Sequence, residues 1–417
     1  MRFVKEINGK EVDAFVLMHP YCHYMKTTLW AEYEAAYEGY DHEFVGVYDD
    51  SDILIATALI LKRRPHLGLK QYWYIPSGMC LDYNDSALLE FFLNQLTEYA
   101  RESKASFVRI DPNVERCHHD IDGEVINDGF DNEAVTQRIK DTGFVHKGYG
   151  YAYNGSWINR FTLIKDISAD LDSVVKSFSK SKIASIKRQE KIGALTVRHG
   201  NRSELHYLRD LEFDLAKAQG SAPHSVAFFE RMYDSFKDHL IYYIAEFDLN
   251  HYTEYLQKEL LSKDVRSDPS QKEKREREIG EVATLKEKYG EKCVIGAGIY
   301  VWYGYKSWNL YNYKRDDFFD YQPTDLIHKR AIAEVKEKGV SSYDMVGFSG
   351  STDPKDPYYG LYYYKRRFNP RFVEHIGEFD FIIDKTEYER FLFNRKVKGK
   401  VLRKVHTGYY KGKDRRR

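Results

Sequence analysis

Cysteine, histidine and aspartate side chains gather most densely at Cys117-His118-His119-Asp120, with Asp122 close behind. These residue types ligate zinc in proteins. Adjacent residues, however, cannot easily turn onto one ion, and no second group with C-x-x-C or H-x-x-x-H spacing completes the set. The sequence therefore predicts no metal site.

A second group, His19, Cys22 and His23, resembles the Cys-His pair of a thiol nucleophile. A reactive cysteine needs surroundings that lower its pKa, and nothing in the sequence marks Cys22 as activated. We interpret Cys22 as a packed thiol or as part of a cleft edge.

Phosphate-binding loops are absent from the sequence. Neither G-x-x-x-x-G-K-[ST] nor G-x-G-x-x-G occurs, so a nucleotide held by such a loop is not supported. The glycine-rich pyrophosphate turn of acetyl-CoA acyltransferases is missing as well, which disfavours an acetyl-CoA donor. No cofactor is predicted.

A basic segment, residues 176–191, could contact RNA. It places Lys180, Lys187 and Lys191 on neighbouring turns of a helix whose other side is apolar. Lysine and serine at this density suit a phosphate backbone. An amphipathic surface helix without a partner has the same pattern, so both interpretations stay open.

A second basic segment begins at Lys365, where Lys365-Arg366-Arg367 directly follows the three tyrosines 362–364. Rings for base stacking then stand beside cations for phosphate, as in proteins that hold single-stranded RNA ends. An edge strand with extended basic side chains is the alternative.

The carboxy-terminal stretch, residues 395–417, holds eleven Lys or Arg residues and one acid, Asp414. Such a stretch can hold tRNA or anionic lipid by charge. A solvated tail without a partner has the same composition.

The whole chain has the composition of a folded protein, with 42% hydrophobic and 31% charged residues. Its 417 residues exceed the roughly 250–300 at which a single core stops growing, so we expect two or three domains. The 64 basic and 64 acidic side chains cancel, so nucleic-acid contact requires a local patch.

Several features indicate a cytoplasmic protein. No apolar run reaches the roughly 18 residues of a membrane span, the longest candidate being Ile53–Leu61. Residues 1–12 are charged and unlike a signal peptide. The cysteines lie far apart without paired spacing, which indicates free thiols in a reducing compartment; they are Cys22, Cys80, Cys117 and Cys293.

Hydrophobic periodicity predicts two similar α+β units. The first is a hairpin of strands, a third strand, a helix and a strand, at residues 44–48, 53–62, 71–76, 87–101 and 107–110. In the second unit, helices around 171–191, 203–218 and 226–237 precede strands and one more helix, at 241–247, 293–302, 308–313, 325–338 and 343–347.

The second unit is interrupted by residues 250–290, which are dense in Lys, Glu and Arg. The few apolar residues recur at steps of three and four, and Ser267-Asp268-Pro269-Ser270 breaks the pattern near its middle. A stripe this narrow can cover a partner helix but not a core. We predict two antiparallel helices that project as a coiled-coil hairpin, in preference to a disordered charged loop.

Six ordered motifs together resemble a known family. They are His19-Pro20-Tyr21 with Trp30-Ala31, Tyr74-Ile75-Pro76-Ser77-Gly78, Val108-Arg109-Ile110-Asp111-Pro112, Lys182 to Arg188, Tyr343-Asp344 with Gly347, and Gly360-Leu361-Tyr362 to Phe368. In order and spacing they resemble the FemABX family of peptidoglycan interpeptide-bridge aminoacyltransferases, from about residue 15 to about residue 390.

The resemblance implies an α/β (α+β) fold of two tandem acetyltransferase-like (GNAT-like) domains. The first domain would span residues 1–155 and be completed by 372–395. The second would span 156–371 and carry the coiled-coil arm, 250–290, with a basic tail at 396–417. In the family the precursor lies in a cleft mainly of the first domain, and the tRNA acceptor end approaches a channel in the second.

Site residues follow from the resemblance by position. Asp111 matches a cleft carboxylate proposed as a base, although a structural cap before Pro112 is the alternative. Lys365 with Tyr364 matches a lysine-aromatic pair near the tRNA end and the reacting ester, and Tyr311 falls near a tyrosine of the substrate cleft. Two groups complete the expected site: Arg109, His224 and Phe228 for substrate, and Lys180, Lys187, Arg188, Arg366 and Arg367 for tRNA.

The sequence also departs from the family pattern. His224 and Phe228 stand where the member that uses a soluble UDP-linked precursor has Arg and Tyr. An early cleft lysine near Trp30 is replaced by Glu32 or Glu34. The diphosphate of such a precursor would therefore be held differently, and a lipid-linked acceptor is expected.

The activity implied by the resemblance is transfer of an amino acid from aminoacyl-tRNA to the stem-peptide amine of lipid II or of a UDP-linked muropeptide. Exchange of an ester for an amide needs positioning and oxyanion stabilisation rather than metal or ATP. Lys365 would stabilise the oxyanion or the terminal phosphate, and Asp111 would orient or deprotonate the amine. An anionic membrane surface and a homo- or heterodimer are further expected partners. A non-catalytic RNA-binding or scaffold protein, and a transferase acting on another amine, stay open.

Overall fold

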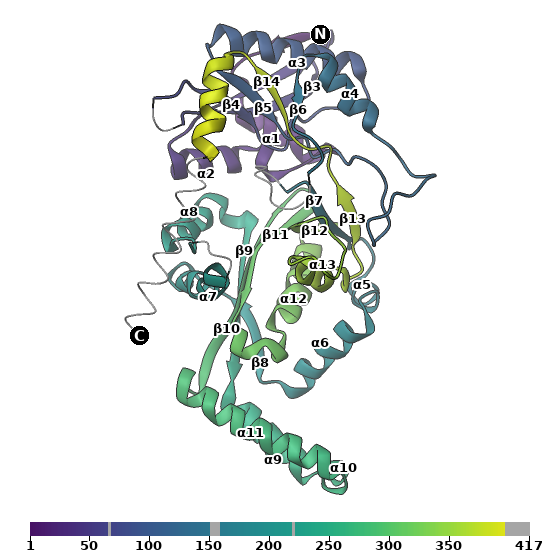
Figure 1. The fold of residues 1–417 in the computed structure, drawn as a ribbon, viewed down its shortest axis with the longest axis vertical. Coiled ribbons are helices and arrows are strands. Elements are labelled where there is room, and N and C mark those ends of the chain that lie inside the picture. Colours follow the sequence, from purple (N-terminus) through teal and green to yellow (C-terminus); the bar gives the residue numbers. More distant parts are fainter. Residues whose placement is uncertain (66–67, 151–158, 219–221, 397–417) are drawn as a thin grey trace.

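The computed structural model describes residues 1–65, 68–150, 159–218 and 222–396. Two α/β units follow one another along the long axis of the molecule, and a helical arm projects from the far end of the second unit (Figure 1). The units share one strand pattern, and the site lies where they meet.

The first unit contains a seven-stranded sheet in the order β1-β2-β3-β4-β5-β14-β6. Its pairs are antiparallel except β4–β5, which is parallel and aligns Trp73 with Val108. The strands are β1 Arg2–Val4, β2 Asp41–Tyr48, β3 Leu54–Arg63, β4 Tyr72–Ile75, β5 Phe107–Ile110, β6 Val145–His146 and β14 Phe379–Ile382.

The second unit repeats this pattern in the order β8-β9-β10-β11-β12-β7-β13. Its parallel pair, β11–β12, takes the same place in the order as β4–β5 and aligns Trp308 with Asp344. The strands are β7 Phe161–Asp166, β8 Leu195–His199, β9 Leu240–Asp248, β10 Lys292–Tyr303, β11 Lys306–Lys314, β12 Ser342–Phe348 and β13 Arg371–Glu374.

The chain crosses between the units twice. It enters the second sheet at β7 and returns to the first at β14, which pairs with both β5 and β6. Before it returns, β13 still pairs with β7, and Phe372 lies opposite Leu163. The boundary expected at residue 372 therefore falls inside a strand of the second sheet.

Helices cover both faces of each sheet. Their bounds are α1 Gly9–Met18, α2 Thr28–Glu38, α3 Ser86–Glu102, α4 Glu133–Asp141, α5 Leu171–Lys176, α6 Lys180–Ile192, α7 His206–Ala218, α8 Val226–Phe236, α9 Leu249–Leu261, α10 Lys263–Ser267, α11 Pro269–Tyr289, α12 Pro323–Glu337 and α13 Tyr359–Arg366. Short 3-10 turns lie at Tyr24–Lys26, Arg202–Glu204, Lys237–His239 and Asp316–Tyr321.

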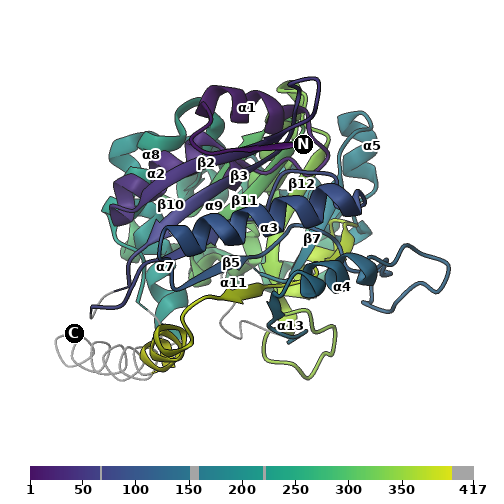
Figure 2. The same cartoon turned by 90° about the horizontal axis from the view of Figure 1, so that it is seen from above.

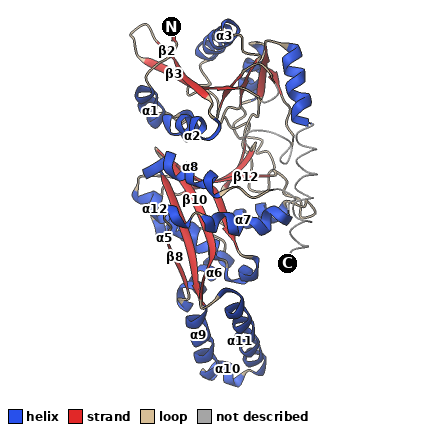
Figure 3. Cartoon of the chain, turned by 90° about the vertical axis from the view of Figure 1, so that its left-hand side faces the viewer, coloured by secondary structure: helices blue, strands red, loops and turns tan. Residues whose placement is uncertain are grey.

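In the first unit α3 runs across the outer face of the sheet (Figure 2). Asp85 caps its amino end by accepting from the Leu88 amide at 2.9 Å. The apolar residues of α3 recur at helical spacing, and Leu89 and Phe92 are buried in one core with Ile60 and Trp73. α1 and α2 cover the other face, toward the second unit (Figure 3).

A single hydrophobic core joins the two units. Tyr33 of α2 and Phe228 of α8 pack edge to face with ring centroids 6.4 Å apart, and residues of β3, α7 and β10 belong to the same cluster. The second sheet has another core on its opposite face, where Ile327 and Ala331 of α12 pack on Tyr243 and Tyr300. The inner helices thus fix how the units face each other.

The arm is a helical hairpin, as predicted. α9 and α11 lie side by side and α10 forms the tip (Figure 3). Asp268 caps α11 by accepting from the Ser270 and Gln271 amides, and Pro269 occupies the first helical position. At its base, Tyr252, Leu256 and Val282 belong to the core of the second unit, so the arm is anchored by packing.

The predicted architecture of two tandem α/β units with an inserted helical arm is confirmed. One local prediction was wrong, and one open alternative is excluded. Residues 171–191 form two helices, because Ser179 caps a new helix, α6, after α5 ends. The tyrosine-rich segment that could have been an edge strand is helix α13, since Tyr362 and Lys365, three residues apart, are both buried on one face. In the described residues no helix combines the length and apolar character needed to cross a bilayer.

Candidate active site

A cavity of about 980 Å³ lies between the two units. The first unit contributes α2 and the ends of β4 and β5, and the second contributes α8, β11 and β12. Its size is at the upper end of small-molecule sites, roughly 300–1,000 Å³. Aromatic walls with convergent charged groups make it the candidate active site.

Asp111 lines this cavity directly after β5. The Tyr74 hydroxyl donates to it at 2.6 Å and the Ser77 amide donates at 2.8 Å. Burial raises the pKa of this carboxyl well above its usual range. Asp111 thus anchors the turn after β4, as a structural cap would, and also faces the cavity, so the structure is compatible with both alternatives.

The turn that Asp111 holds is tightly packed. Ser77 adopts a φ of +57°, and Gly78 follows with a φ of +70°. A Cβ on Gly78 would lie 2.7 Å from the Cα of Pro112. Glycine is therefore required there, and the Tyr74–Gly78 motif has a steric basis.

Glu34, rather than Glu32, is the acidic residue of α2 that faces the cavity. Its carboxylate pairs with the Arg63 guanidinium at 2.8 Å, and both side chains are buried. Arg63 also lies over the Tyr74 ring, 4.5 Å from its centroid. The first unit therefore presents a neutralised ion pair to the cavity.

Arg109 does not line the cavity. Its guanidinium donates to both carboxylate oxygens of Asp380 at 2.7 Å. Arg109 is 1% exposed, and Asp380 lies opposite it on β14. The substrate-binding role expected for Arg109 has no geometric support here, since its charge is used to fix the returning strand β14 to β5.

Tyr311, His224 and Phe228 lie together on the wall of the second unit. The Tyr311 ring centroid is 5.4 Å from that of His224 and 5.8 Å from that of Phe228. His224 Nδ1 is 2.7 Å from a Glu212 carboxylate oxygen. The structure thus brings together three residues that the resemblance placed near substrate, as an aromatic patch, while Arg160 and Arg371 line other parts of the cavity.

Lys365 lies just behind the cavity wall. Its ammonium donates to the carbonyls of Val346 and Gly347 at 3.0 and 2.9 Å, and both of these residues line the cavity. Lys365 is 7% exposed, and burial lowers its pKa from 10.5 to about 8. Only the backbone of Val346 and Gly347 therefore separates this ammonium from the cavity.

The backbone of β12 is irregular where Lys365 contacts it. The pairing of β12 with β7 shifts between Asp344 and Gly347. The Asp344 carboxylate accepts from the Thr162 hydroxyl and from the Val346 amide, and burial raises its pKa. A Cβ on Gly347 would meet the Asn159 amide nitrogen at 2.0 Å, so glycine is required where these groups converge.

Tyr364 belongs to a second polar cluster, on the other side of β12 from the cavity. Its hydroxyl donates to Thr324 at 2.8 Å, and the Lys182 ammonium lies 3.7 Å from its ring centroid. Lys182 forms a buried ion pair with Asp325, and burial lowers its pKa to about 8. Tyr364 and Lys365, neighbours in sequence, therefore serve different clusters.

The two predicted RNA-contacting segments are adjacent. Arg367 follows α13 and donates to the Ser181 hydroxyl of α6 at 2.6 Å, while Arg366 pairs with Asp122 at 2.9 Å. The cations expected on α6 are exposed to solvent; they are Lys180, Lys187 and Arg188. One basic surface thus extends over α6 and α13, as RNA contact would require.

Cys22 is a packed thiol. It is fully buried, and burial raises its pKa to about 11. Its Sγ lies 3.8 Å from the Tyr303 carbonyl. This environment disfavours a thiolate.

Several cavity residues were not found from the sequence. Lys306 lies on β11, Asn159 precedes β7, and His375 follows β13. No local pattern marks them, because long-range strand pairing brings them together. Asp344 and Gly347 did belong to a family-like motif, and that motif was the available signal.

A family model described as the FemAB family matches residues 7–395. Among curated proteins, the chain is 24% identical over 427 residues to the aminoacyltransferase FemA of Staphylococcus aureus strain N315, covering 96% of this chain and 100% of that protein. It is 24% identical over 430 residues to the lipid II:glycine glycyltransferase of Staphylococcus haemolyticus strain JCSC1435, covering 94% and 99%.

Among solved structures, the crystal structure of FemX superposes with a TM-score of 0.75. The two sequences are 23% identical, and the match covers 93% of this chain and 99% of that one. At this identity the likeness establishes the fold, including the relative placement of the two units.

Proposed function

We propose that this protein transfers an amino acid from aminoacyl-tRNA to the stem-peptide amine of lipid II. The chain belongs to the FemAB family and is an aminoacyltransferase, which supports this proposal. The observation that carries this proposal is the cavity between the units, to which both units contribute charged and aromatic groups. Such a junction suits a reaction in which two large substrates meet at one bond.

The chemistry is aminolysis of an ester. The acceptor amine attacks the carbonyl carbon that is esterified to the tRNA ribose, and a tetrahedral oxyanion forms. The C–O bond then breaks, the amine loses a proton, and the ribose oxygen gains one. An ester is exchanged for an amide, so positioning and oxyanion stabilisation supply most of the acceleration.

Lys365 is the cation that we assign to the developing oxyanion or to the terminal phosphate. Its ammonium donates to the carbonyls of Val346 and Gly347, which line the cavity. Coulombic interactions strengthen in a buried site where water is excluded. The Lys365 ammonium lies directly behind this backbone, so it would favour the negative charge of an oxyanion that develops on the cavity side.

Asp111 is the group that we assign to the acceptor amine. It faces the cavity from the first unit, where it is held by Tyr74 and Ser77. A carboxyl whose pKa is raised by burial is better matched to accepting a proton near neutrality than an ordinary aspartate. Its fixed orientation would also hold the amine in line with the ester.

The tRNA donor is assigned to the basic surface on α6 and α13. Lys180, Lys187 and Arg188 project from α6, next to Arg366 and Arg367. Phosphate contacts of this kind position a nucleic acid without reading its sequence. This side of the second unit also carries Tyr364, which can meet the acceptor end.

Charge supports the proposed acceptor and its location. Glu212 and Phe228 surround His224, so no guanidinium stands at this position. The arginines that do line the cavity each pair with a carboxylate; they are Arg63, Arg160 and Arg371. The basic tail, residues 397–417, lies outside the described residues, and we assign it to the anionic surface of the membrane that carries lipid II. The enzyme would thus work at the inner face of the cell membrane.

The deciding experiment incubates the full-length protein with a mixture of charged tRNAs and a lysine-containing lipid II. Mass spectrometry should find the acceptor heavier by one or more amino-acid residues, and deacylated tRNA should give no product. tRNA binding without any product would favour a non-catalytic RNA-binding protein. Transfer to another amine but not to lipid II would replace the proposed acceptor.

A further inference from the structure

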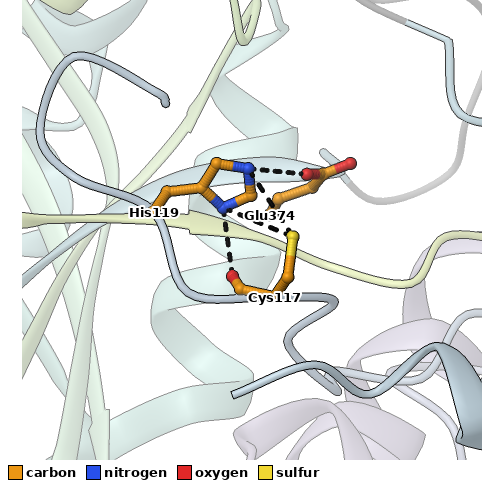
Figure 4. A group of neighbouring side chains, drawn as sticks. All are labelled: Cys117, His119 and Glu374. Atoms are coloured by element: carbon orange, nitrogen blue, oxygen red, sulfur yellow. Dashed lines mark hydrogen bonds and ion pairs between the residues drawn. The ribbon is translucent and has the colours of Figure 1, made fainter. Parts of the chain in front are cut away.

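We propose that Cys117, His119 and Glu374 bind a zinc ion that fastens a loop of the first unit to the edge of the second sheet. The Cys117 sulfur, a His119 ring nitrogen and a Glu374 oxygen converge on one point (Figure 4), and these atoms all lie within 4.8 Å of one another. The three residues are 8%, 6% and 4% exposed. Sulfur, imidazole and carboxylate together form a donor set that zinc accepts.

The sequence predicted no metal site because adjacent residues cannot turn onto one ion and no second group completes the set. The structure changes both points. Cys117 and His119 lie in an extended segment, where each forms an antiparallel bridge with Asp131 and Val125, respectively. Residues two apart on an extended chain point to the same side. The third ligand, Glu374, comes from β13, far along the sequence, which no local spacing could reveal.

The distances suit a tetrahedral ion. Cys117 Sγ lies 3.8 Å from His119 Nε2, and His119 Nε2 lies 3.1 Å from Glu374 Oε2. Zinc bonds of about 2.3 Å to sulfur and about 2.0–2.2 Å to nitrogen and oxygen give tetrahedral edges of roughly 3.4–3.6 Å. The remaining edge, from Cys117 Sγ to a Glu374 oxygen, is at most 4.8 Å, so side-chain shifts of up to about 1 Å would seat the ion, and a water would complete the coordination.

A cation at this point would satisfy the hydrogen bonding around His119. His119 Nδ1 lies 3.0 Å from the Cys117 carbonyl oxygen, which only accepts, so Nδ1 carries the proton. In a neutral ring Nε2 is then an acceptor, yet it faces the Glu374 carboxylate, another acceptor. Metal-bound histidines characteristically donate their other nitrogen to a carbonyl in this way.

A proton on Nε2 is the competing cation, and charge does not decide between the two. Arg160 and Arg116 both donate to Glu374 Oε1, which leaves Oε2 for the cation. A zinc ion with one thiolate adds a single positive charge, the same as protonation of His119. The sulfur distinguishes them, because zinc uses it as a ligand and a proton shared by nitrogen and oxygen does not.

The position of the site gives the ion a structural role. The Arg116 amide donates to the Glu374 carbonyl at 2.7 Å, so the loop already pairs with the end of β13. Further along the same loop, the Ile121 carbonyl accepts from the Tyr362 hydroxyl of α13 at 2.7 Å. Zinc would therefore stiffen the loop that supports α13, and this role requires no assumption about donor or acceptor.

Zinc content of the tag-free, full-length protein tests the proposal. After dialysis against EDTA and addition of zinc, metal analysis should find one tightly bound zinc per chain. Cys117→Ser and His119→Asn should each weaken zinc binding by at least about 100-fold, more than loss of a supporting group does. Zinc should raise the melting temperature of the parent protein and not of these variants.

Matched controls come from the same chain. His118→Asn removes the neighbouring imidazole, which stacks on Phe130 with centroids 5.4 Å apart, and Cys293→Ser removes a partly buried thiol elsewhere. Both controls should keep the zinc. Cobalt added to the parent protein should give a thiolate-to-metal absorption band, which decides the matter if a variant fails to fold. Absence of zinc and of this band, or equal zinc retention by His119→Asn, would leave a protonated His119 paired with Glu374 and would overturn the proposal.

Discussion

The Lys365 ammonium donates to the Val346 carbonyl at 3.0 Å, and Val346 adopts a φ of +60°. A left-handed conformation is unfavourable for a β-branched residue, so the surrounding contacts must hold it. The Asp344 carboxylate accepts from the Val346 amide at 2.7 Å. The Lys365 ammonium therefore holds the carbonyl of Val346 and the Asp344 carboxylate holds its amide, on either side of a strained residue in the cavity wall.

Replacement of Lys365 should impair transfer and stability together. We expect Lys365→Ala to lower transfer at least about 100-fold, the loss expected for one group that stabilises the oxyanion. Because two carbonyls lose a charged donor, unfolding free energy should also fall, by about 1.5–3 kcal/mol. Initial rates and denaturant titration measure the two effects. Lys355→Ala, which changes an exposed lysine, is the control. Near-normal turnover by Lys365→Ala would remove this residue from the mechanism.

The pH dependence of transfer should report the charge of Lys365. Burial lowers its pKa from 10.5 to about 8, so the cation is present below pH 8 and is lost as the pH rises through 8. The rate should fall on this alkaline limb. Lys365→Arg keeps its charge well above this range, so its alkaline limb should move to higher pH. Lys182→Arg is the control. Burial lowers the pKa of Lys182 to about 8 as well, so this variant should leave the alkaline limb in place if Lys365 is its source. An unchanged limb in Lys365→Arg would contradict the assignment.

The buried pair of Lys182 and Asp325 should matter more for stability than any surface pair. Lys182→Met leaves an unpaired buried carboxylate, which typically costs about 3–5 kcal/mol. The double variant with Asp325→Leu should recover most of this loss, since neither charge then remains. Denaturant unfolding measures both free energies. A loss below about 1 kcal/mol in the single variant, as for an exposed pair, would contradict a buried ion pair.

Prediction from sequence succeeded where local periodicity carries the information. β2 and β3 are apolar, largely buried runs on either side of a polar turn, α3 has a regular apolar face, and the arm keeps its narrow stripe. These patterns depend on neighbours within a few residues. They indicated part of the element order in each unit and a mixed α+β class, whereas the tandem acetyltransferase-like arrangement was implied only by the family resemblance.

The sequence could not reveal contacts that only long-range pairing creates. β14 is four residues long, and its place between β5 and β6 depends on partners far away in the chain. Arg109 was expected to bind substrate, but it pairs with Asp380 on β14. The cavity residues Asn159 and His375 depend on the same crossings between the units.

Shortening the arm to different extents should separate the contribution of its base to the core from the contribution of its outer part to tRNA binding or self-association. Replacing residues 250–290 by a two-residue turn is geometrically possible, because Asp248 and Lys292 pair directly. It would remove Tyr252, Leu256 and Val282 from the core, however, and should cost several kcal/mol of stability. A second, shorter cut that replaces only residues 259–275 leaves these three residues in the chain. This shorter cut should leave the unfolding transition nearly unchanged and weaken tRNA binding or self-association.

Filter binding and sedimentation measure these properties. If the shorter cut leaves both tRNA binding and oligomeric state unaltered, the tip of the arm serves neither. If it prevents folding, the helical hairpin is part of the core, in conflict with its exposed outer half.

The acceptor should be lipid II rather than a soluble UDP-linked precursor. His224 and Phe228 provide no guanidinium for a diphosphate, and arginine is the residue suited to bidentate phosphate contacts. A neighbouring carboxylate, Glu212, holds His224 Nδ1 at 2.7 Å and would oppose an anion. The basic tail could add about 1 kcal/mol per cation near an anionic leaflet.

Transfer to lipid II in anionic vesicles, compared with transfer to the matching UDP-linked pentapeptide at equal concentration, decides between the acceptors. We expect a clear preference for lipid II, and a preference for the UDP-linked acceptor would reject the hypothesis. The double variant His224→Arg with Phe228→Tyr should improve use of the UDP-linked acceptor, because it adds a bidentate phosphate donor at the cavity wall. Deleting residues 397–417 should reduce transfer to vesicle-bound lipid II while tRNA binding is kept. Loss of tRNA binding in this deletion would assign the tail to the donor instead.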